Sequence, residues 1–141
     1  MPERVGRSAA EGLERSCEGR DWVEGRGPID GIELWRAFFA ERAYATHRHD
    51  TYAIGVTESG VQVFDYRGRA ERSRPGDVVV LHPDEAHDGR PGTAEGFGYR
   101  IVYVEPARIA DAVAILRGAP APLPFARRAV SSNTTLAGAV A

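Results

Sequence analysis

The middle of the chain alternates apolar and polar residues with the period of a β-strand. Within residues 51–58, Tyr52, Ile54 and Val56 occupy every second position, and Ser59-Gly60 leads into a similar run over residues 61–66. Residues two apart on a strand point to the same face of a sheet. Two such runs joined by a short turn are typical of a β-hairpin, so we predict a hairpin over residues 51–66.

Further strands are indicated on both sides of this hairpin, separated by glycine and proline. They cover an apolar run at residues 31–39, a polar edge strand at 69–73 after an Arg67-Gly68 turn, a buried strand at 78–81, and a strand at 99–104 after a glycine-rich loop at 88–96. Pro75-Gly76 suits a type II turn, because proline sets φ at the first central position and glycine accepts positive φ at the second. Tyr99, Ile101 and Tyr103 are expected on one face of the last strand.

A helix is predicted from Pro106 to Gly118. Proline is tolerated at the first helical position, an apolar stripe follows at helical spacing, and glycine ends the helix. Asn133 or Thr134 could cap a second helix. Because strands precede the helices instead of alternating with them, we predict a mainly β fold, a small antiparallel barrel followed by one or two C-terminal helices.

The 141 residues are most simply one domain. Residues 1–30 are charged and rich in glycine, which favours a mobile N-terminal arm that Trp22 and Val23 could anchor. Residues 31–118 form the predicted barrel and its helix. Residues 119–141 are expected to be a proline-rich linker and the start of a truncated helix.

Composition excludes several classes of function. A formal net charge of −2 provides no basic face for nucleic acid. No apolar run reaches membrane-spanning length, and the N-terminus has no secretory signal, so we expect a cytoplasmic protein without a membrane partner. Cys17 is the only cysteine, which rules out an intrachain disulfide and a thiolate zinc site.

All four histidines lie in two short segments, His47-Arg48-His49 and His82 to His87. On a strand His47 and His49 would share a face, and His87 would return from a second strand to meet them. Three neutral imidazoles could hold iron or zinc. The carboxylate that commonly follows such a pair is missing, because Tyr52, Ala53 and Ile54 hold the corresponding positions.

Two other interpretations of the histidines remain open. The rings could simply hydrogen-bond to each other and to backbone at the end of the barrel. They could also present polar groups in a small-molecule pocket with otherwise apolar walls, which is the interpretation we favour. Gln62, Phe64 and Tyr66 share one strand face and could line such a pocket or cover the outside.

Two segments resemble a known family. Residues 47–55 (HRHDTYAIG) and 76–89 (GDVVVLHPDEAHDG), followed by GYRIVYV at 98–104, look like the N-terminal sensor domain of AraC-type transcriptional regulators. The resemblance implies a cupin-like barrel that binds an effector, often a sugar or an aromatic compound. It also implies dimerisation, with a homodimer possible, and a helix-turn-helix domain that is absent from this chain, so the chain by itself should not bind operator DNA.

The resemblance and the chemistry together define the candidate site. The ligand-binding candidates are His47, His49, Tyr52, His82 and His87, with Trp35 and Tyr103 as aromatic surfaces for stacking. We assign no catalytic residue, metal ligand or cofactor, and expect a sensing domain that is not an enzyme. The alternative is a metal-dependent cupin enzyme with iron or zinc on His47, His49 and His87.

Overall fold

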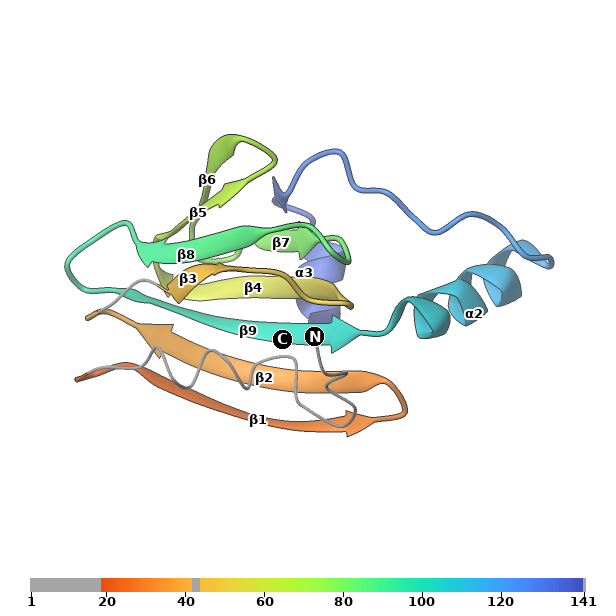
Figure 1. Ribbon diagram of the computed structural model, residues 1–141, viewed down its shortest axis with the longest axis horizontal. Helices are drawn as coiled ribbons and strands as arrows, with labels where there is room; N and C mark the ends of the chain where they lie inside the picture. The colour runs from red at the N-terminus through yellow and green to blue at the C-terminus, as the bar shows by residue number, and fades with distance from the viewer. Residues whose placement is uncertain (1–18, 42–43, 141) are drawn as a thin grey trace.

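The computed structural model describes residues 19–41 and 44–140, which form two antiparallel sheets facing each other (Figure 1). The first sheet has the strand order β1 (Trp22–Ile29), β2 (Ile32–Phe39), β9 (Phe97–Val104), β4 (Tyr52–Gly60), β7 (Val78–Leu81) and β10 (Val130–Ser131). The second has the order β3 (Tyr44–His47), β8 (His87–Pro91), β5 (Gln62–Tyr66) and β6 (Arg69–Ser73). The two helices are α2 (Pro106–Arg117) and α3 (Thr134–Val140). The prediction of a mainly β antiparallel barrel followed by helices is confirmed.

Aromatic side chains fill one end of the space between the sheets. Phe39, Phe64 and Phe97 are fully buried, and the rings of Phe39 and Phe97 lie 6.0 Å apart. Phe97 pairs with Gly60 at the last position of β4, whereas Tyr103 pairs with Ala53 near its first. The aromatic core therefore occupies the end of the barrel where β4 finishes, and the end where β4 begins is left for other side chains.

The predicted hairpin over residues 51–66 is wrong. Both runs are strands, but β4 pairs with β9 and β7, while β5 pairs with β6 and β8 in the other sheet. Gly60 has a φ of 65° and lies at the corner where the chain crosses between the sheets. Alternation predicts a strand but not its partner, and both edges of β4 are taken by strands distant in sequence.

Other turns follow the sequence prediction. Arg67 and Gly68 have positive φ angles of 53° and 74° and join β5 to the edge strand β6, as a two-residue hairpin turn requires. Gly76 has a φ of 88°, and the Asp77 N–H donates to the Arg74 carbonyl at 2.9 Å, as expected for the Pro75-Gly76 turn. The predicted loop at 88–96 is shorter than expected, because most of β8 occupies its first half.

The structure describes only part of the N-terminal arm that was predicted over residues 1–30. Residues 1–18 lie outside the described part of the chain. Residues 22–29 form β1, which pairs with β2 along its length, so the arm prediction does not hold there. Most β1 residues are exposed because it is an edge strand, and this explains why its sequence lacks a clear apolar alternation.

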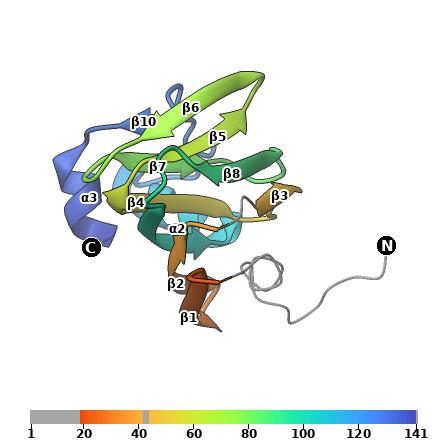
Figure 2. The same cartoon turned by 90° about the vertical axis from the view of Figure 1, so that its left-hand side faces the viewer.

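Residues 119–129, here called the strap, lead from α2 across one end of the barrel to β10 (Figure 1). The Val80 N–H donates to the Ala129 carbonyl at 2.8 Å, and Ala129 is buried in the core. Asn133 Oδ1 caps α3 by accepting the Leu136 N–H at 3.0 Å, as predicted. Figure 2 shows α3 beside β4, on the outside of the first sheet. The region predicted as a linker thus packs against the barrel.

Gly60 lies where the chain crosses from the first sheet to the second, and substitutions there test this arrangement. A Cβ at Gly60 would lie 1.8 Å from the Gly96 carbonyl oxygen, whereas one at Gly68 would contact nothing within 4 Å, although φ is positive at both. We expect Gly68→Ala to cost about 1 kcal/mol, the usual penalty for a left-handed residue, and Gly60→Ala to cost at least about 3 kcal/mol. Urea unfolding measures the loss of stability in both variants. Equal losses would contradict the close packing of Gly60 against Gly96 at the corner between the sheets.

Candidate functional site

Three of the four histidines meet at the end of the barrel opposite the aromatic core. The pairing of β3 with β8 places His47 directly opposite His87, and His49 follows two residues after His47. The ring centroids lie 4.5 Å apart for His47 and His87, 4.8 Å for His47 and His49, and 5.3 Å for His49 and His87. One ring nitrogen from each lies within 4.8 Å of the others. We call these residues the histidine cluster.

Backbone carbonyls orient two of these rings. His47 Nδ1 lies 2.8 Å from the Ala45 carbonyl oxygen, and His87 Nδ1 lies 3.2 Å from that of Glu85. A carbonyl oxygen only accepts hydrogen bonds, so each neutral ring carries its proton on Nδ1 and has an unprotonated Nε2. His47 Nε2 then accepts from His49 Nε2–H at 3.1 Å.

Burial keeps His47 and His87 uncharged at neutral pH. His87 is only 5% exposed, and burial, together with the nearby positive charge of protonated His47, lowers its pKa to about 4. Burial also lowers the pKa of His47, although its bond to the Ala45 carbonyl opposes this. Neutral imidazole is the form that binds metal ions and accepts hydrogen bonds from ligands.

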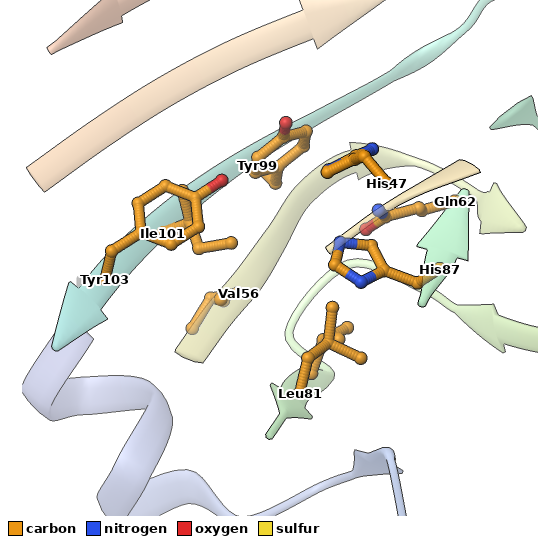
Figure 3. A pocket seen from close by; sticks show the side chains of 10 residues that line it. His47, Val56, Gln62, Leu81, His87, Tyr99, Ile101 and Tyr103 are labelled. Atoms are coloured by element: carbon orange, nitrogen blue, oxygen red, sulfur yellow. The ribbon is translucent and has the colours of Figure 1, made fainter. Parts of the chain in front are cut away.

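A small cavity lies beneath His47 and His87 (Figure 3). Its volume is about 20 Å³, enough for one water-sized group but not for a sugar or an aromatic ring. The cavity is lined in part by Tyr99, Ile101 and Tyr103, the three residues expected on one face of β9. An organic effector would therefore have to bind at the mouth of the barrel or widen the interior.

Two polar side chains accompany the histidines in this interior. Tyr103 is buried, with its ring 4.8 Å from that of His49. Gln62 is buried and lines the cavity, so the face of β5 that it shares with Phe64 and Tyr66 points inward. Alternation alone left the direction of that face open, and Gln62 was missing from the sequence-based set of ligand-binding residues.

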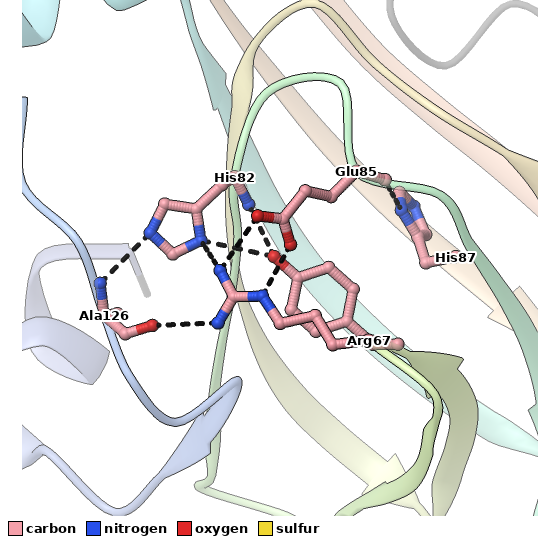
Figure 4. A network of polar contacts seen from close by, with 6 residues as sticks. Arg67, His82, Glu85, His87 and Ala126 are labelled. Carbon is pink, nitrogen blue, oxygen red and sulfur yellow. Dashed lines mark hydrogen bonds and ion pairs between the residues drawn. The ribbon is translucent and has the colours of Figure 1, made fainter.

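The remaining candidates lie away from the cluster. His82 contacts the strap, where its Nε2 accepts the Ala126 N–H at 3.0 Å (Figure 4). Tyr52 has its ring 5.6 Å from that of His82, and its hydroxyl donates to the Pro124 carbonyl at 2.9 Å. Trp35 packs across Gly25 at the junction of β1 and β2. The structure thus brings His47, His49, His87 and Tyr103 together, and places the other three elsewhere.

The chemistry of the cluster fits a divalent transition metal ion. Imidazole nitrogens suit zinc, iron, nickel and copper, and metal-bound histidines usually donate their other ring N–H, often to a backbone carbonyl, as His47 and His87 do here. Tetrahedral bonds of about 2.05 Å separate ligand atoms by about 3.3 Å, so the cluster would need to contract, and His49 would need to move its proton to Nδ1. No carboxylate among the described residues belongs to the cluster.

The comparison with protein families identifies the domain. Residues 31–140 match the AraC-like ligand binding domain. The chain belongs to this family. Membership implies that a small-molecule effector binds the domain, and the match extends through the strap and α3, beyond the 31–118 range that we predicted for the barrel and its helix. No curated protein matches the chain.

Solved structures with the same fold share little sequence with the chain. A cupin barrel protein from Salinispora arenicola is 22% identical, with a TM-score of 0.55, over 70% of this chain and 87% of that one. The cupin domain of an XRE-family transcriptional regulator from Enterobacter cloacae is 17% identical, with a TM-score of 0.53, over 62% and 99%. A putative mannose-6-phosphate isomerase from Ralstonia eutropha is 13% identical, with a TM-score of 0.56, over 62% and 87%. These similarities establish a cupin fold.

None of the described helices combines the length and the apolar character needed to cross a membrane.

The lowered pKa of His87 predicts a dependence of stability on pH. Between its unfolded value of about 6.5 and its folded value of about 4, the unfolded chain binds more protons, so acidification should weaken the fold. We expect EDTA-treated protein to lose roughly 2 kcal/mol of unfolding free energy between pH 7 and pH 5 from this group. His87→Gln should flatten the profile in urea unfolding, and an unchanged slope in this variant would contradict the assignment.

Proposed function

We propose that this chain is the sensor domain of an AraC-type transcriptional regulator and that its ligand site is the histidine cluster. The observation that carries the proposal is the convergence of three imidazoles, two of which are oriented by backbone carbonyls and kept neutral by burial. Oriented polar groups beside an apolar interior are typical of small-molecule sites. The family match to a ligand-binding domain supports the same conclusion.

The ligand held directly by the cluster is, in this proposal, a divalent transition metal ion. The cavity of about 20 Å³ has room for an ion and no room for a sugar or an aromatic ring. When bound, such an ion supplies positive charge and open coordination positions for oxygen donors. An organic effector would then bind over His49, which is only partly buried, and beside Tyr103.

Binding without turnover is the role that we propose for this site. The cavity is lined by His47, His87, Gln62 and apolar or aromatic side chains, without a carboxylate. The alternative is a metal-dependent cupin enzyme that uses the same three histidines. Incubation of the metal-loaded protein with sugars and aromatic acids would favour that alternative if product accumulated.

Regulation of transcription would require a DNA-binding domain in addition to the barrel. With a net charge of −2, the chain offers no basic excess to hold a phosphate backbone, so contact with DNA would come from an attached helix-turn-helix domain. A homodimer could form through α2, on which Ile115 and Leu116 are 82% and 85% exposed.

Metal titration tests the proposal directly. Protein stripped of metal and titrated with Co²⁺ should bind one ion per chain, with the visible absorption of nitrogen-ligated cobalt. His49→Ala should weaken binding at least about tenfold, because it removes one of three ligands. Glu58→Gln is the control, since Glu58 pairs with Arg36 and Arg100 away from the cluster, and should retain the affinity.

Two results would overturn the proposal. One is the absence of saturable Co²⁺ binding to the folded protein. The other is equal loss of affinity in His49→Ala and Glu58→Gln, which would place the ion elsewhere or indicate a general loss of structure.

A further inference from the structure

The strap crosses the same end of the barrel as the histidine cluster, and a single turn contacts both. This turn comprises residues 82–86, between β7 and β8. We propose that the strap is a conformational reporter of the cluster: a ligand bound by the histidines tightens the turn and, through it, the attachment of the strap. This inference rests on the proposed function and adds to it the route by which occupancy reaches the C-terminal part of the chain.

Backbone contacts join the turn to the cluster. The Glu85 carbonyl accepts the His87 Nδ1–H at 3.2 Å, and the Asp84 N–H donates to the His49 carbonyl at 2.7 Å. Asp84 has a φ of 62°, so its backbone occupies a region that non-glycine residues seldom adopt. A ligand that fixes the rings of His49 and His87 therefore also restrains the two peptide groups that shape the turn.

The side chain of Glu85 joins the same turn to the strap through Arg67. Its two carboxylate oxygens accept from Arg67 Nε at 2.6 Å and Nη2 at 3.0 Å, a two-point contact that fixes the plane of the guanidinium group (Figure 4). Arg67 Nη1 donates to the Ala126 carbonyl at 3.4 Å. The guanidinium carbon lies 4.6 Å from the ring centre of Phe125. Glu85 thus holds His87 with its backbone and positions the strap with its carboxylate.

The first residue of the turn, His82, also contacts the strap directly. The ring of His82 stacks on Phe125 at 4.8 Å, with 30° between the planes, while its Nε2 accepts the Ala126 N–H. Phe125 therefore contacts both an imidazole and a guanidinium that depend on the turn. It is nevertheless 66% exposed, so few contacts with the barrel core hold it.

This combination suits a reporter better than a rigid structural brace. A segment attached by a few exposed polar contacts opens easily, and small changes at its anchors shift its population. Because linkage is reciprocal, a ligand that strengthens the anchors must bind more tightly when the anchors are intact. Two effects are therefore expected. Ligand binding should slow the opening of the strap, and loss of an anchor should weaken ligand binding by a matching factor.

Hydrogen exchange measures the first effect, with Co²⁺ as the probe ligand. The full chain is compared with and without saturating Co²⁺, whose binding is followed by its absorption in the same samples. We expect exchange of peptides covering residues 122–128 to slow about fivefold or more when the ion binds. Peptides from β6, at the far edge of the second sheet, should not change.

Variants of the anchors measure the second effect. Glu85→Gln removes the charged contact to Arg67 but keeps the carbonyl that orients His87, and we expect Co²⁺ affinity to fall about fivefold. Glu58→Gln is the matched control, because Glu58 also accepts from arginines, Arg36 and Arg100, away from the turn. Phe125→Ala should weaken Co²⁺ binding in the same direction, whereas Leu123→Ala, on the same strap, should not. Phe125 and Leu123 are both exposed, so these two variants should fold.

The outcomes separate this inference from the proposed function. Slower strap exchange with bound Co²⁺, together with weaker binding in Glu85→Gln and Phe125→Ala alone, supports the reporter. Saturable Co²⁺ binding with unchanged strap exchange, or equal affinities in all four variants, overturns the reporter and leaves the metal site intact. Failure of the unmodified protein to bind Co²⁺ overturns the proposed function and, with it, this inference.

Discussion

Two backbone carbonyls, those of Ala45 and Glu85, determine what the histidine cluster can do. An imidazole without a fixed partner exchanges tautomers and turns about its χ angles, so three neighbouring histidines do not by themselves make a binding site. Here each carbonyl takes the Nδ1 proton of His47 or His87, and Nε2 is left as an acceptor within the cluster. Burial holds the same rings neutral by lowering their pKa values. Orientation and charge state are therefore set before any ligand arrives.

Strand pairing in the barrel places these carbonyls beside the histidine rings. Register between β3 and β8 sets His47 opposite His87, and the phenylalanines at the opposite end leave only a small cavity near the rings. The same turn that supplies the Glu85 carbonyl carries the carboxylate that binds Arg67. Ligand site and strap therefore share one structural element, and this proximity makes coupling between them physically reasonable.

Local sequence patterns predicted most strands, the turns at Arg67-Gly68 and Pro75-Gly76, and α2, because each depends on neighbouring residues. Strand pairing was not predictable in this way: β4 pairs with β9, which is distant in sequence (Tyr52 with Val104, Gly60 with Phe97), and the expected hairpin with β5 does not form. Strand alternation and the return of a second strand predicted the meeting of His47, His49 and His87. His82 follows the buried Leu81 on β7 and reaches the strap instead. The contacts of the strap were not predicted, because its proline-rich composition is typical of a linker.

The histidine cluster depends on His47 and His87 being neutral in the Nδ1–H tautomer, which leaves Nε2 of each ring unprotonated. Long-range nitrogen–proton NMR correlations on ¹⁵N-histidine-labelled, metal-free protein at pH 7 report this state ring by ring. Both residues should show a protonated Nδ1 and an unprotonated Nε2. Protonation of Nε2 in either ring, or equal averaged shifts for its two nitrogens, would show that the carbonyls do not orient the cluster and would contradict the account.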